Sequence, residues 1–179
     1  MKNIVLTLAL LVLCSFILLY QLDADLMERE TYRVKAACDR ISSAASLCID
    51  GDAYALGQIV FSCDRGNDLA FEMLRGNLGY DESYYPESND YFSGQASMRL
   101  YYFDDSLQAR CYENGSFAGS FEFLYGREAG QYVPEYSDTG ILIEKPCVVC
   151  VLDCGRPNIR AGVSPDGLKI VRKSIYEYR

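Results

Sequence analysis

Cysteine is the residue type in this sequence that offers the widest choice of chemistry. The 179-residue chain holds eight cysteines and no histidine. Without histidine, a metal site would have to be built from thiolates and carboxylates, and proton transfer near neutral pH would lack its usual side chain. Cys147, Cys150 and Cys154 follow a C-x-x-C-x3-C spacing, which resembles that of thiol-redox motifs and zinc knuckles. They are the candidate thiols of this chain.

The residues around these thiols favour a structural role instead. Val148 and Val149 are β-branched and lie in an apolar run, whereas a redox C-x-x-C opens a helix whose N-terminus lowers the thiol pKa. On a strand, side chains three positions apart point to opposite faces, so Cys147 and Cys150 would not share a ligand. We expect no metal, no cofactor and no catalytic residue, and we keep an envelope thiol-redox or metal-binding protein as the alternative function.

Other sequence signatures also speak against an enzyme or a nucleic-acid-binding protein. The chain contains no G-x-S-x-G, G-K-[ST] or G-x-G-x-x-G motif. Its net charge of −8 is the wrong sign for a phosphate backbone. The adjacent carboxylates Asp104 and Asp105 match no calcium-loop pattern, and we interpret them as solvated.

The N-terminal segment is apolar enough to cross a membrane. Residues 4–20 read IVLTLALLVLCSFILLY and carry no charge. Extended to Asn3 and Leu22, this segment spans roughly 30 Å as a helix, which is the thickness of a bilayer core. A cleaved signal peptide is the competing interpretation, but the apolar run is longer than usual and no small-x-small cleavage site follows. We assign residues 1–22 to a transmembrane anchor that contacts the lipid bilayer through residues 4–20.

The charges beside this anchor predict its orientation. Lys2 and the α-amino group lie on the short side, while Asp23, Asp25 and Glu28 precede Arg29 on the other side. Basic residues favour the cytoplasmic side of a membrane. We therefore expect a single-pass protein of the cell membrane with a cytoplasmic N-terminus and an extracytoplasmic bulk.

The helix is predicted to continue beyond the membrane. Residues 23–49 contain neither glycine nor proline, so they should form a helical stalk. A stripe of mostly small apolar side chains recurs along one face at steps of three and four residues: Val34, Ala37, Cys38, Ile41, Ala44, Ala45 and Cys48. This candidate helix-packing face has two interpretations. It packs on the chain's own sheet, or it docks on the helix of a partner subunit.

Residues 50–179 carry the signals of a mixed helix and strand domain. The apolar segment 56–62 predicts a strand, and residues 67–79 predict a short helix that Asn67 or Asp68 caps and Gly79 closes. The pair Asn114-Gly115 favours a tight hairpin.

Further strand signals lie in residues 97–105, 108–114, 116–126, 140–154 and 167–179. We expect an α+β fold, in which a long N-terminal transmembrane-plus-stalk helix packs on a mainly antiparallel sheet of about five or six strands with one short helix. The domains are then the anchor (1–22), the stalk (23–49) and an extracytoplasmic α+β domain (50–179).

Tyrosine is unusually frequent in the middle of the chain. Most of the fifteen tyrosines fall between Tyr80 and Tyr136, in a stretch rich in acidic residues, and residues 80–96 lack a clear period. Such a surface could bind a protein or a glycan. Alternatively, the tyrosines cover the sheet.

The overall layout resembles that of a known group of small membrane proteins. The anchor that starts at Lys2 leads into LGQIVFSCDRGNDLAFEMLRGNL (56–78), a late KPCVVCVLDCG strand (145–155) and the closing GLKIVRKSIYEYR (167–179). This order is similar to TadE-like, pseudopilin-like single-pass proteins associated with the Tad-type pilus machinery of Gram-positive bacteria. The resemblance implies a non-enzymatic structural or assembly role in the cell envelope. It also implies contacts with other envelope or pilus-like subunits through the N-terminal helix.

Overall fold

The computed structural model describes residues 2–87, 91–158 and 169–178. Their helices are α1 (Lys2–Ser46), α2 (Gly51–Ala55), α3 (Cys63–Leu78), α4 (Ala129–Tyr132) and the 3-10 turn η1 (Pro134–Tyr136). The strands are β1 (Phe92–Ser93), β2 (Ser97–Phe103), β3 (Gln108–Glu113), β4 (Ser116–Glu122), β5 (Arg127–Glu128), β6 (Leu142–Ile143), β7 (Cys147–Asp153), β8 (Arg156–Pro157) and β9 (Val171–Glu177).

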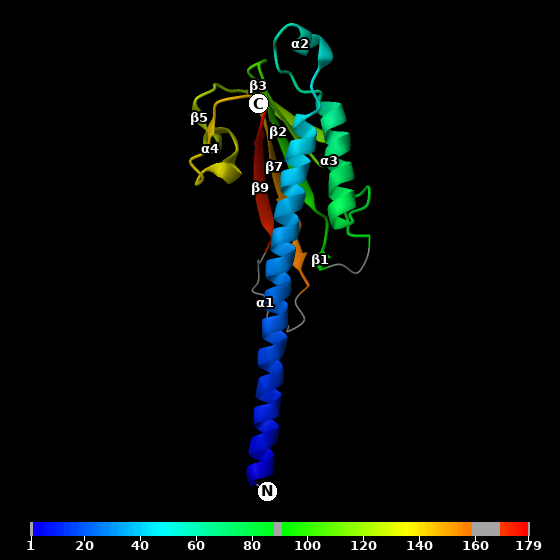
Figure 1. Cartoon of the computed structure of the whole chain (residues 1–179), viewed down its shortest axis with the longest axis vertical. Coiled ribbons are helices and arrows are strands. Elements are labelled where there is room, and N and C mark those ends of the chain that lie inside the picture. The colour runs from blue at the N-terminus through cyan, green and yellow to red at the C-terminus, as the bar shows by residue number, and fades with distance from the viewer. Residues whose placement is uncertain (1, 88–90, 159–168, 179) are drawn as a thin grey trace.

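Helix α1 is continuous over 45 residues, as the sequence predicts. Its first half projects away from the rest of the chain, and its second half lies along the sheet beside α3 (Figure 1). No helix breaker occurs before Gly51, so the same helix serves both halves. Just beyond, the Asp50 side chain accepts hydrogen bonds from the amides of Asp52 and Ala53 and caps α2.

The main sheet has five antiparallel strands in the order β4-β3-β2-β7-β9. The predicted hairpin is confirmed: Asn114 and Gly115 both have positive φ, and Glu113 pairs with Ser116 across the turn. Two positive φ values in a two-residue loop match the right-handed twist of the flanking strands. The fold is therefore α+β, with the long N-terminal helix packed on an antiparallel sheet.

Two hydrophobic cores lie on opposite faces of this sheet. The first core lies between the sheet and helices α1 and α3, and it includes Ile41, Leu74 and Leu100. The second core, which includes Phe103 and Phe123, is covered by the chain between β4 and β7. Strand β7 is buried on both faces because it is flanked by β2 and β9 and covered from both sides.

Three predicted elements differ from the structure. Residues 56–62 do not form a strand: Phe61 makes only an isolated bridge with Ile49, because Gly57 turns the chain with a positive φ. Helix α3 begins at Cys63 rather than near Asn67, since the Gly66 amide already donates to the Ser62 carbonyl.

The long apolar run 140–154 contains two short pieces rather than one strand. Leu142–Ile143 pairs with β5, and Pro146 separates it from β7. The closing strand is confirmed at Val171–Glu177, and positions 167, 168 and 179 of its predicted range lie outside the described residues.

Two helical glycines should respond with opposite sign to the same substitution. A Cβ on Gly130 of α4 would lie 2.4 Å from the Cα of Ser137, which is backbone and cannot move aside. Gly130→Ala should therefore destabilise the fold by about 1–3 kcal/mol. A Cβ on Gly76 of α3 meets nothing within 4 Å, so Gly76→Ala should stabilise it by about 0.5–1 kcal/mol. Urea unfolding of both variants checks this, and a shared sign would contradict the structure.

Candidate functional site

The candidate helix-packing face of α1 lies in the first core. All of its members are buried except Ala44, which is partly exposed. The Cys38 thiol lies 3.5 Å from the carbonyl oxygen of Cys150, and the Ser42 hydroxyl lies 3.0 Å from that of Ser174. The chain's own sheet therefore occupies this face, and no partner helix can dock there in the folded protein.

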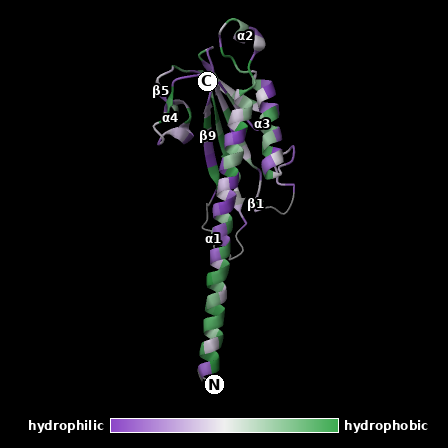
Figure 2. Cartoon of the chain, in the orientation of Figure 1, coloured by the Kyte–Doolittle hydropathy of each residue, from purple (hydrophilic) through white to green (hydrophobic). Residues whose placement is uncertain are grey.

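The other half of α1 is exposed and apolar. It is the one helix among the described residues that is long and apolar enough to cross a membrane. The lower part of α1, which carries residues 4–22, projects beyond the domain and is almost entirely hydrophobic (Figure 2). Large side chains there, such as Leu6, Leu11 and Phe16, are each 64% exposed. Apolar surface of this extent on one helix is the signature of a membrane or partner contact.

The candidate thiols are split between the two cores. Cys147 belongs to the second core, whereas Cys150 and Cys154 belong to the first core together with Cys38. This is the alternation that a strand imposes on positions three apart. All eight cysteines are free thiols in the structure. Cys147 and Cys150 therefore cannot act as a vicinal dithiol, and no group of three His, Cys, Asp or Glu among the described residues is arranged to hold a metal ion.

The environment of these thiols keeps them protonated. Burial raises the pKa of Cys154 from its ordinary value of 9.0 to about 12. A hydrogen bond with Cys38, together with burial, raises the pKa of Cys150 well above the same value, and burial raises that of Cys147. Thiolates are the reactive species, so these three cysteines are chemically inert while the protein is folded.

This inertness predicts slow modification and alkaline instability. At pH 8, Cys147, Cys150 and Cys154 should react with a maleimide at least ~100-fold more slowly than an exposed thiol. Leu56→Cys supplies that reference thiol, because Leu56 is 81% exposed. Above pH 9, the unfolded chain releases its thiol protons while the folded chain retains them, so the free energy of unfolding should fall as the pH rises toward 12. Rapid labelling of the native thiols, or a stability independent of pH above 9, would contradict this assignment.

The carboxylates of the β2–β3 connection have a structural role. Asp104 is fully buried: its Oδ2 accepts from the Phe61 amide at 3.2 Å and from the Arg110 guanidinium. Asp105 accepts from the Ile59 amide at 2.7 Å. The interpretation of this pair as solvated is wrong. The two carboxylates attach the loop before α3 to the end of the sheet where β2 and β3 connect.

Most tyrosines of the middle stretch cover the sheet. Tyr80, Tyr84, Tyr101, Tyr102 and Tyr136 are buried in the two cores. Within the loop that follows α3, strand β1 pairs with β8, and residues 88–90 lie outside the described chain. The covering interpretation therefore holds for these five side chains, and a broad tyrosine-rich binding face is not present in them.

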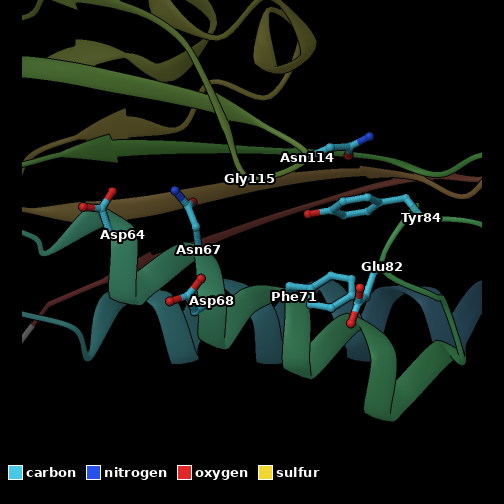
Figure 3. Close-up of a pocket in the computed structure, with 8 residues that line it drawn as sticks. All are labelled: Asp64, Asn67, Asp68, Phe71, Glu82, Tyr84, Asn114 and Gly115. Atoms are coloured by element: carbon cyan, nitrogen blue, oxygen red, sulfur yellow. The ribbon is translucent and has the colours of Figure 1, made fainter.

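A pocket of about 310 Å³ lies between α3, the loop after it and the β3–β4 hairpin turn (Figure 3). We call it the acidic pocket. It is lined by three carboxylates, two side-chain amides, two aromatic rings and one glycine: Asp64, Asp68, Glu82, Asn67, Asn114, Phe71, Tyr84 and Gly115. Sequence reasoning missed this site because its residues come from separate segments. The one signal available was the spacing of Asp64 and Asp68, which places two acids on one helix face.

No protein-family model matches the chain, and no curated protein or solved structure is significantly similar to it. The fold defines the class of the chain by its layout: an α+β domain carried on a long N-terminal helix whose free half is apolar. This layout agrees with the resemblance given above.

Proposed function

We propose that this chain is a membrane-anchored, non-enzymatic structural or assembly component of a cell-envelope apparatus, of the pilus or secretion type. The observation that carries the proposal is the continuity of α1, whose apolar half is exposed and whose other half is part of the first core. A domain joined to its anchor without a flexible linker is held at a defined orientation, which suits a subunit of an ordered assembly better than a freely diffusing enzyme.

The exposed surface of α1 is where partner subunits would bind. Because the face from Val34 to Cys48 is covered by the chain's own sheet, contacts with other helices fall to residues 4–22. The hydroxyls of Thr7 and Ser15 in this segment donate hydrogen bonds to the backbone carbonyls of Asn3 and Leu11. These hydrogen bonds remove two polar groups from the apolar surface, so bilayer and partner helices can both be accommodated there.

The non-enzymatic part of the proposal rests on the chemistry of the described residues. Their buried thiols are protonated, their buried carboxylate Asp104 is paired with Arg110, and they hold no cluster suited to a metal ion. The layout shared with TadE-like proteins supports the assembly role. The acidic flank at Asp23, Asp25 and Glu28 supports an extracytoplasmic domain.

Membrane topology can be tested with single added thiols in a chain whose exposed Cys14 and partly exposed Cys111 are replaced by serine, since the buried native thiols react slowly. In intact cells, a membrane-impermeant maleimide should label Leu56→Cys at once, and Asn3→Cys only after lysis. Both added thiols lie at exposed positions, so the comparison depends on sidedness and not on burial. The reverse pattern would overturn the orientation, and release of the chain by carbonate washing would overturn the anchor.

The assembly role needs a second experiment. A photo-crosslinking residue placed in turn at Leu6, Leu11 and Ile17 should give adducts with a second envelope protein, concentrated on one face of α1. The same residue at Tyr32, an exposed position in the stalk, tests whether contacts extend beyond the membrane. Adducts with lipid alone at every position would contradict the proposed partner contacts while leaving the anchor in place.

A further inference from the structure

The acidic pocket holds two buried polar side chains whose hydrogen-bonding capacity the described residues do not fill. Tyr84 is 8% exposed, and among the described residues no group accepts a hydrogen bond from its hydroxyl. Asn67 is 6% exposed; its Oδ1 accepts from the Tyr102 hydroxyl at 3.1 Å, which leaves the amide nitrogen free of a described partner. Figure 3 shows the Tyr84 hydroxyl and the Asn67 amide aimed into the space beside the hairpin turn. Neither atom is among the fully buried polar atoms of the described residues that lack a partner, so both are accessible to a ligand that enters the pocket.

The rim of the same pocket carries uncompensated negative charge. Asp64, Asp68 and Glu82 are exposed, and none of them forms an ion pair with a described residue. Asp64 lies in the first turn of α3, where the helix dipole favours an acid. That reason does not extend to Asp68, one turn later, or to Glu82 in the loop. Three like charges around one depression repel one another and attract a cation.

The arrangement selects the chemistry of the ligand. The carboxylates are not clustered closely enough for a metal ion, since no such group occurs among the described residues. The ligand must bring a cation for the rim and an acceptor for the donors of Asn67 and Tyr84. A polyamine has donors only. A lysine or arginine residue in a peptide has both, because peptide carbonyls lie at the other end of its alkyl stem from the charged group, and this stem can lie on the Phe71 ring.

We propose that the acidic pocket binds the ammonium or guanidinium group of a lysine or arginine side chain presented by a protein partner. The volume of about 310 Å³ lies at the lower end of the range for small-ligand sites, which suits one side chain and its adjoining peptide bond. The inference concerns the folded domain alone. It does not depend on the anchor or on the assembly role proposed above, so either can fail without the other.

Titration of the full chain in neutral detergent micelles tests the proposal. The probe is the capped tripeptide Gly-Arg-Gly, and the readout is the NMR shift of the Asn67 side-chain amide, with Gly-Gln-Gly as the neutral comparison. We expect saturable shifts with the arginine peptide, weakened by added salt. Spermidine and free arginine form a second arm: saturation by them without saturation by the peptide would overturn the protein-borne source of the cation. Absence of any saturable shift with all four probes would overturn the site.

Matched variants assign the binding to this pocket. Asp68→Asn and Glu72→Gln each remove one exposed acid from α3, but only Asp68 lines the pocket. Asp68→Asn should weaken binding of the arginine peptide about tenfold, the loss of one charge-assisted hydrogen bond, whereas Glu72→Gln should leave it nearly unchanged. Equal weakening by both variants would mean a general charge effect and would overturn the assignment.

Tyr84→Phe separates binding from folding. The Tyr84 hydroxyl has no described protein partner, so its removal should leave the melting temperature of the free chain unchanged while weakening the arginine peptide several-fold. A lower melting temperature with unchanged affinity would assign the hydroxyl to the fold and remove it from the site.

Discussion

Removing residues 1–49 should abolish cooperative folding, whereas removing residues 1–22 should leave a folded and soluble domain. The shorter deletion takes away exposed apolar side chains, which contribute nothing to the core. The longer deletion removes Val34, Cys38 and Ile41, which are fully buried against β7, β9 and α3. Loss of a single buried Ile or Val side chain costs about 1–5 kcal/mol, and a domain of this size is stable by only about 5–15 kcal/mol.

Thermal unfolding followed by circular dichroism distinguishes the two deletions. Residues 23–179 should melt in one transition, and residues 50–179 should show no transition or aggregate. Ile41→Ala in the shorter deletion provides a graded version of the same change, and the exposed Tyr32→Ala on the same helix is its control. If residues 50–179 melted at the same temperature as residues 23–179, the second half of α1 would not belong to the core.

Substitution of Asp104 should have the second largest effect. Its carboxylate is completely buried and accepts hydrogen bonds from the backbone amides of Phe61 and Ser106, at 3.2 and 3.1 Å, as well as from Arg110. Asp104→Ala would leave these donors without their acceptor and leave the half-buried Arg110 charge unpaired. Breaking a buried pair on one side costs about 3–5 kcal/mol. Urea unfolding should therefore shift to markedly lower concentration.

Asp138→Ala is the matched control, because Asp138 is exposed and forms no ion pair with a described residue. Its effect should stay within about 0.5 kcal/mol of zero. A double-mutant cycle with Arg110→Ala then measures the coupling, since the second substitution should cost little once Asp104 is gone. Additive effects of the two substitutions would mean that they do not interact in the folded protein.

Elements defined by local signals were predictable from the sequence. Helix α1 follows from the absence of glycine and proline before Gly51, and the β3–β4 hairpin follows from Asn114-Gly115. These signals act within a few residues, so they need no knowledge of what packs against them.

Elements that depend on distant partners were not predictable in the same way. Residues 56–62 are apolar enough for a strand, but Phe61 instead enters the first core and its amide donates to Asp104, 43 residues away. Helix α3 extends back to Cys63 because Gly66 can lie against the Tyr102 ring, where any side chain would collide. In each case a tertiary contact overrides a local preference.

The candidate sites divide along the same line. The stripe along α1 was recognised from its helical period. Only the structure could show that this face packs on the chain's own sheet and not on a partner helix. The placement of Cys147 and Cys150 on opposite faces of the sheet was foreseen from the alternation of a strand. The acidic pocket was not foreseen, because it joins Asp68, Tyr84 and Gly115 from three segments that only the fold brings together.

Because α1 is unbroken, the proposed anchor and the folded domain move as one rigid unit. A helix without a hinge transmits tilt and rotation from the bilayer directly to the sheet. The direction in which the acidic pocket faces, around the membrane normal, is therefore fixed by which side of residues 4–22 contacts a neighbour. Each residue inserted into α1 between the bilayer and Val34 would rotate the domain by about 100° and move it about 1.5 Å further from the bilayer. The length of α1 between the bilayer and the domain, and not only its composition, thereby sets the direction in which the domain faces.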